Sequence, residues 1–76
     1  MTLSRFFEII AREWEKPKEK LQKFEDKFEE EMIENIADLI AISENSVQWE
    51  KMTESFPMGV TNRIKMKLTE ITTATN

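Results

Sequence analysis

Large apolar residues recur every three or four positions along most of this chain. The first run forms one helical face and consists of Leu3, Phe6, Phe7, Ile10 and Trp14. Because an α-helix completes a turn every 3.6 residues, this spacing predicts an amphipathic helix. A hydroxyl at Thr2 or Ser4 is suited to cap its free N–H groups. Pro17 either ends this helix near Lys16 or opens the next one.

The second periodic run covers residues 18–42. Its apolar stripe consists of Leu21, Phe24, Phe28, Met32, Ile36 and Leu39 or Ile40. Further apolar residues from Ile33 onward make the second half apolar nearly all round, which indicates burial on several sides. Since the pattern changes midway, we predict two helices with a break between Glu30 and Asn35 rather than one long helix.

A third helix pattern follows the turn cluster at residues 43–46. Ser46 is a plausible N-cap, and the buried stripe of this helix consists of Trp49, Met52 and Phe56. Phe56 precedes Pro57, and a residue before proline is disfavoured in the helical conformation. The segment is therefore expected to end there.

The last pattern predicts a helix capped by Thr61. Its inward residues are Val60, Ile64, Leu68 and Ile71, which leaves Met66 exposed on the opposite side. Residues 64–68 also alternate like a strand, but no second strand candidate exists to pair with them, so we favour a helix. Residues 72–76 are expected to fray. The whole pattern predicts an all-α fold, a small five-helix bundle.

The composition narrows the chemistry that such a bundle can carry. The chain has 76 residues, 39% of them hydrophobic, with neither cysteine nor histidine. This length supports one domain over residues 1–76, with a core over about residues 4–72. The absence of both residue types removes disulfides, thiolate metal sites and the usual general base. No calcium-binding loop pattern and no nucleophile–base pair occurs, so we expect no enzyme activity, metal or cofactor.

No long apolar run or signal-peptide pattern appears, which favours a cytoplasmic protein without a membrane span. The net charge is −4, and the charges are distributed unevenly. Acidic residues concentrate between Glu25 and Glu50, whereas the predicted last helix begins with Arg63, Lys65 and Lys67. The chain therefore has an acidic middle and a basic end.

The order of these segments resembles that of a sterile alpha motif (SAM) domain. Leu21-x-x-Phe24-x-x-x-Phe28-x-x-x-x-Ile33 is similar to the family's second helix, and the segment 33–43 to its third. Val47-Gln-Trp49 resembles the fourth helix, and the Gly-led segment 56–68 resembles the start of the long final helix. The chain departs from the family at Asn35, where glycine is usual, and at Thr61, where a basic residue is common.

The resemblance implies a protein–protein interaction module, such as a signalling scaffold, that oligomerises or pairs with another helical domain. In this family an acidic mid-surface commonly meets the N-terminal end of the last helix of another molecule. By that resemblance the acidic side consists of Glu30, Glu31, Glu34 and Asp38, and the other side of Met58, Gly59, Asn62, Arg63, Met66 and Lys67. The alternatives are an RNA-binding member of the family, for which the negative net charge is unfavourable, and an unrelated helical-bundle adaptor or regulator.

Overall fold

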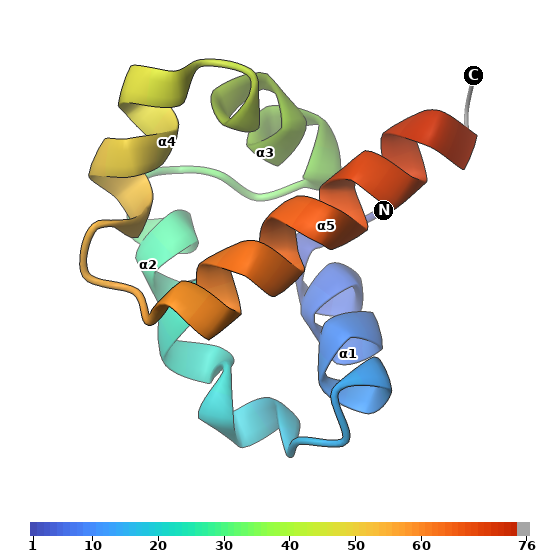
Figure 1. The fold of residues 1–76 in the computed structure, drawn as a ribbon. Coiled ribbons are helices and arrows are strands. Elements are labelled where there is room, and N and C mark those ends of the chain that lie inside the picture. Colours follow the sequence, from blue (N-terminus) through green and yellow to red (C-terminus); the bar gives the residue numbers. More distant parts are fainter. Residues whose placement is uncertain (75–76) are drawn as a thin grey trace.

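Five helices enclose the core in the computed structural model, which describes residues 1–74 (Figure 1). The elements are α1 (Leu3–Glu13), the 3₁₀ turn η1 (Lys18–Lys20), α2 (Gln22–Glu30), α3 (Ile36–Ser43), α4 (Ser46–Thr53) and α5 (Met58–Ala74). Within these residues no strand is formed, so the five-helix, all-α prediction is confirmed. The predicted break between Glu30 and Asn35 is also confirmed, and the strand alternative for residues 64–68 is wrong.

The core lies between α5, which runs diagonally across the front of the bundle in Figure 1, and the rest of the bundle. Phe28 of α2 is fully buried, and its ring centroid lies 6.2 Å from that of Phe7 and 5.5 Å from that of Phe56. Trp49 is buried as predicted, whereas Trp14 is only half-buried. The Cα radius of gyration is 11.5 Å, close to the ~11 Å that scaling gives for a compact chain of this length.

The helix caps confirm one prediction and correct two. The Thr2 hydroxyl accepts from the Arg5 N–H at 3.2 Å and caps α1 as expected. The cap of α4 is Asn45 rather than Ser46, because the amide oxygen of Asn45 accepts from the third residue along. The expected Thr61 cap is wrong too: α5 begins at Met58, and the carbonyl of the preceding Pro57 accepts from the Thr61 N–H at 3.1 Å.

The two ends of the chain are both well ordered as far as the structure describes them. At the N-terminal end, Leu3 is buried and belongs to the packed region. At the other end α5 continues through Ala74, beyond the expected start of fraying at Thr72. Residues 75 and 76, which belong to the segment expected to fray, lie outside the described residues.

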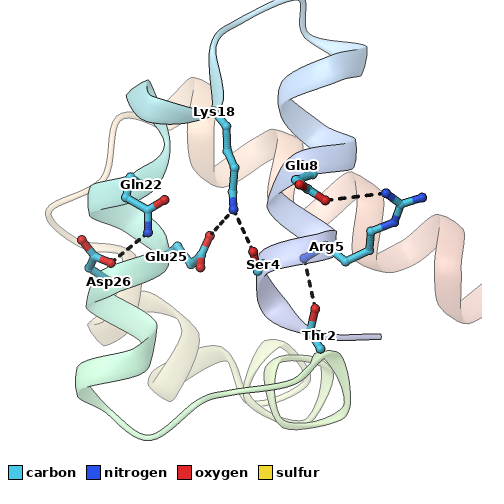
Figure 2. A network of polar contacts seen from close by, with 8 residues as sticks. All are labelled: Thr2, Ser4, Arg5, Glu8, Lys18, Gln22, Glu25 and Asp26. Carbon is cyan, nitrogen blue, oxygen red and sulfur yellow. Dashed lines mark hydrogen bonds and ion pairs between the residues drawn. The ribbon is translucent and has the colours of Figure 1, made fainter.

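Glu25, which the sequence analysis counted in the acidic middle, is buried and is held by an ion pair (Figure 2). Glu25 is 4% exposed, and its carboxylate lies 3.5 Å from the Lys18 ammonium, which also donates to the Ser4 hydroxyl at 2.8 Å. The Glu25 Oε1 atom accepts no hydrogen bond. Glu25 therefore joins α2 to η1, and through Lys18 to α1, and it contributes nothing to the acidic surface.

Candidate protein-interaction surface

The predicted acidic residues form a corner of the molecule between α2 and α3. This acidic corner consists of Glu30 at the end of α2, Glu31 and Glu34 in the connection, and Asp38 in the first turn of α3. All four side chains are exposed, and none of them forms an ion pair within the described residues. The corner therefore presents uncompensated negative charge to solvent.

The backbone makes a sharp stop at the centre of this corner. The Met32 N–H donates to the Glu29 carbonyl and the Ile33 N–H to the Phe28 carbonyl, both at 2.9 Å. This pair of hydrogen bonds is a Schellman motif, in which the residue after the helix C-cap adopts the left-handed conformation. That residue is Met32, at φ 63°, where glycine is usual. Ile33 turns into the core, whereas the Met32 side chain is 78% exposed between acidic neighbours. The predicted place of Met32 on the apolar stripe is therefore wrong, because α2 ends at Glu30 and the left-handed turn takes Met32 off the helix face.

The connection after Met32 is held in place by the N-terminal residues. Leu3 donates its N–H to the Glu34 carbonyl, and Ile36 donates to the Met1 carbonyl, around an isolated bridge between Thr2 and Asn35. The Asn35 side chain also accepts from the Asp38 N–H at 3.0 Å and caps α3. The backbone that carries the acidic corner is therefore fixed by hydrogen bonds at both ends.

The surroundings of Glu29, the residue directly before the corner, shift its ionisation. Partial desolvation, with the neighbouring carboxyl groups of Glu25, Asp26 and Glu34 adding to it, raises the pKa of Glu29 above its ordinary value. Ionising this group therefore disfavours the folded chain slightly. A cation placed next to the corner would relieve that repulsion.

The second predicted surface, at the start of α5, exposes two methionines. Met58 is 80% exposed and Met66 is 65% exposed, which confirms the predicted exposure of Met66. Gly59 and Asn62 are exposed as well. The aromatic edge of Trp14 lies 3.8 Å from where a Cβ of Gly59 would stand, so α1 packs close beside this turn. The surface is thus largely uncharged and apolar near the helix start.

The cations of α5 are occupied by groups of the same chain. The Lys67 ammonium is hydrogen-bonded to Glu13 of α1 at 2.7 Å and lies 3.2 Å from Glu70. Lys65 donates to the Ser43 carbonyl at 2.7 Å, and the Arg63 guanidinium stacks 4.4 Å from the centroid of the Trp14 ring. The basic character predicted for this end is therefore reduced, because each cation already has a partner.

The sequence reasoning missed these partners and one further feature of α2. Lys23 and Lys27 border a groove beside Phe56 and Pro57, directly before α5. Their spacing of four residues on one helix was the signal that could have placed them together. A separate hollow of about 400 Å³, between the ends of α3 and α5, is lined by Ile40, Ser43, Glu44, Lys65, Leu68, Thr69, Thr72 and Thr73 and includes no predicted site residue.

The described part of the chain holds no group of three or more potential metal-ligating side chains. None of its helices has both the length and the apolar content needed to cross a membrane.

No protein-family model, no curated protein and no solved structure matches this chain. Over the described residues the chain is a compact five-helix, all-α domain.

Proposed function

We propose that this chain is a SAM-like protein–protein interaction domain that self-associates. The observation that carries the proposal is the acidic corner, with four exposed, unpaired carboxylates and the exposed Met32 among them. An exposed apolar side chain surrounded by charge is typical of an interface, where it supplies an anchor and the charges supply orientation. A cytoplasmic location is part of this proposal, and it is supported by the lack of cysteine, since small secreted domains are commonly rich in disulfides.

The complementary surface is the start of α5. Met58 and Asn62 are exposed there, and the unpaired N–H groups of the helix carry a partial positive charge. One copy contributes its acidic corner and the next copy its helix start, so the contact joins two different surfaces. Such a head-to-tail contact repeats into a chain of molecules unless the geometry closes it into a ring.

The test is sedimentation of the purified chain over a range of concentrations at low salt. Wild type is expected to gain mass with concentration. Glu31→Lys with Glu34→Lys, or Met58→Glu with Asn62→Glu, is expected to weaken the association by about tenfold or more, because like charges then face each other. Met58→Glu should leave folding intact, since an acid in the first turn of a helix is favourable. A wild type that stays monomeric at high micromolar concentration would rule out self-association and favour a different protein as the partner.

The RNA-binding alternative depends on free cations at α5. Arg63, Lys65 and Lys67 each contact a group of their own chain, which makes them poor candidates for binding phosphate. Electrophoretic titration with a single-stranded RNA distinguishes the two functions. An RNA affinity that falls in Lys65→Glu and stays unchanged in Glu31→Lys would favour RNA binding.

A further inference from the structure

A groove beside α2 combines free positive charge with an apolar floor. It has a volume of about 260 Å³ and is lined by Lys23, Phe24, Lys27, Ser55, Phe56 and Pro57. The rings of Phe24 and Phe56 lie 4.8 Å apart at its base and are largely buried. Since one water occupies ~30 Å³ of liquid, the groove can accept an unbranched side chain of several heavy atoms.

The two lysines of this groove differ from the cations of α5. Neither Lys23 nor Lys27 forms an ion pair within the described residues, and the Lys23 ammonium lies over the face of Phe24, 5.2 Å from the ring centroid. Lys67, by contrast, is held by two carboxylates. The groove ends at Pro57, one residue before α5, so its free charge borders the helix start named above.

The acidic corner has the complementary chemistry. Met32 is a flexible, unbranched apolar side chain on a left-handed residue, and it projects into solvent next to Glu30 and Glu31. Its conformation is unfavourable for a residue with a Cβ, and exposure gives it no packing in the single chain. A strained and exposed residue of this kind points to a contact outside the molecule.

We propose that Met32 of one copy inserts into the groove of a second copy, where Lys23 and Lys27 pair with the partner's acidic corner. This inference rests on the proposed self-association. It states which cations bind the acidic corner of the other copy, namely the lysines of α2 and not those of α5. Phe24 and Phe56 supply the apolar floor for the methionine, and the exposed Met58 lies next to the groove in sequence. The occupant is a second copy of this chain, because the chain itself carries the exposed apolar side chain of Met32 and the carboxylates of the acidic corner that match the groove.

The experiment compares Lys23→Glu/Lys27→Glu with the control Lys16→Glu/Lys20→Glu. Both pairs change the net charge by the same amount, and the control lysines are exposed outside the groove. Reversal in the groove is expected to raise the dissociation constant about tenfold or more at low salt, and the control is expected to stay within about threefold of wild type. Circular dichroism melting of each variant establishes that it is folded.

A second measurement follows Met32 directly. The chain has five methionines, so methyl labelling gives a small set of NMR signals. The Met32 signal, assigned with Met32→Ala, is expected to shift with concentration in wild type and in the control but not in the groove variant. Association of the groove variant at wild-type strength, with Met58→Glu and Glu31→Lys still weakening it, would overturn this inference alone. A monomeric wild type would overturn it together with the proposed self-association.

Discussion

Two of the residues that the structure describes occupy the left-handed conformation without being glycine. Glu15 at φ 57° lies just after α1, and Met32 at φ 63° lies just after α2, in each case with two backbone hydrogen bonds closing the last turn. The left-handed region costs a residue with a Cβ roughly 1–2 kcal/mol. Both side chains are exposed, so packing does not offset this cost. Each position therefore lowers the stability of the isolated domain.

Met32→Gly is expected to raise the free energy of unfolding by about 1 kcal/mol, because glycine adopts this φ without steric crowding. Urea unfolding measures the change. Met32→Ala keeps the Cβ and the strain, so its stability should stay within about 0.5 kcal/mol of wild type. The glycine variant should also associate more weakly, since the apolar anchor is lost. Equal stability of the two variants would show that the left-handed turn is not strained.

Substitutions in the aromatic core are expected to lower the stability of the domain, in contrast to Met32→Gly. Phe28→Ala and Trp49→Ala should each lower the free energy of unfolding by about 3–5 kcal/mol, because both side chains are buried and leave a cavity. Phe28 contacts rings from α1 and from the segment before α5, so its loss affects three parts of the bundle. Thermal melting provides the test, with the exposed Met66→Ala as control. A melting temperature within a few degrees of wild type would place the substituted side chain outside the core.

At the scale of elements, Lys67 connects the two ends of the chain. It joins α5 to Glu13 of α1, and the hydrogen bond to Glu13, together with Glu70, raises the pKa of Lys67 above its ordinary value of 10.5. A raised lysine pKa stabilises the folded state fully below the unfolded pKa, and this contribution is lost as pH rises through the folded pKa. The pairing therefore contributes at neutral pH and fails only in alkaline solution.

Lys67→Met tests this contribution. At pH 7 the variant is expected to lose no more than about 1 kcal/mol, because Glu13 and Glu70 are largely solvent-exposed and such pairs are weak. The difference between wild type and variant should shrink as pH rises above 10.5, since wild type then loses the same interaction. Guanidinium unfolding at pH 7 and at alkaline pH measures both. A difference that stays constant with pH would mean that the lysine stem, and not its charge, provides the stability.

The elements themselves were predictable because their signals are local. Apolar spacing identified the buried faces, and the switch near Ile33 identified the break that Met32 makes. The caps were less certain, because Asn45 and Ser46 are both good N-cap residues and only the backbone geometry selects one. Local pattern thus fixes which segments are helical and, less sharply, where each begins.

The candidate site was only half predictable, because charge pairing depends on how the helices pack. Glu13 and Lys67 are 54 residues apart in the chain, and nothing in the sequence between them indicates their contact. The stacking of Arg63 on Trp14 is similarly distant. The exposure of Met66 followed from helical periodicity, whereas the same periodicity wrongly placed Met32 on the apolar stripe. The burial of Glu25 needed the position of Lys18. A count of charges along the sequence therefore overstates both the acidic and the basic surface.

For the whole molecule, the proposed contact makes a prediction about assembly size. A contact between two different surfaces leaves one free surface at each end, so wild type should extend beyond a dimer. A two-fold contact between identical surfaces would stop at the dimer instead. Sedimentation at increasing concentration separates these cases, and association steered by charge should weaken as salt is raised and the Debye length falls below about 10 Å.

Mixing two variants, each damaged on one surface, tests this geometry most directly. The first carries Glu31→Ala, Met32→Ala and Glu34→Ala, and the second carries Met58→Glu and Asn62→Glu; all five side chains are exposed, so both should fold. Each variant alone is expected to be monomeric. Their equimolar mixture should form dimers that do not extend, because the intact corner of the second variant meets the intact helix start of the first. Alanine, rather than lysine, is chosen for the first variant so that its altered corner carries no positive charge that could attract the glutamates of the second variant. A mixture that stays monomeric would contradict the head-to-tail contact, and one that extends would show that another surface also binds.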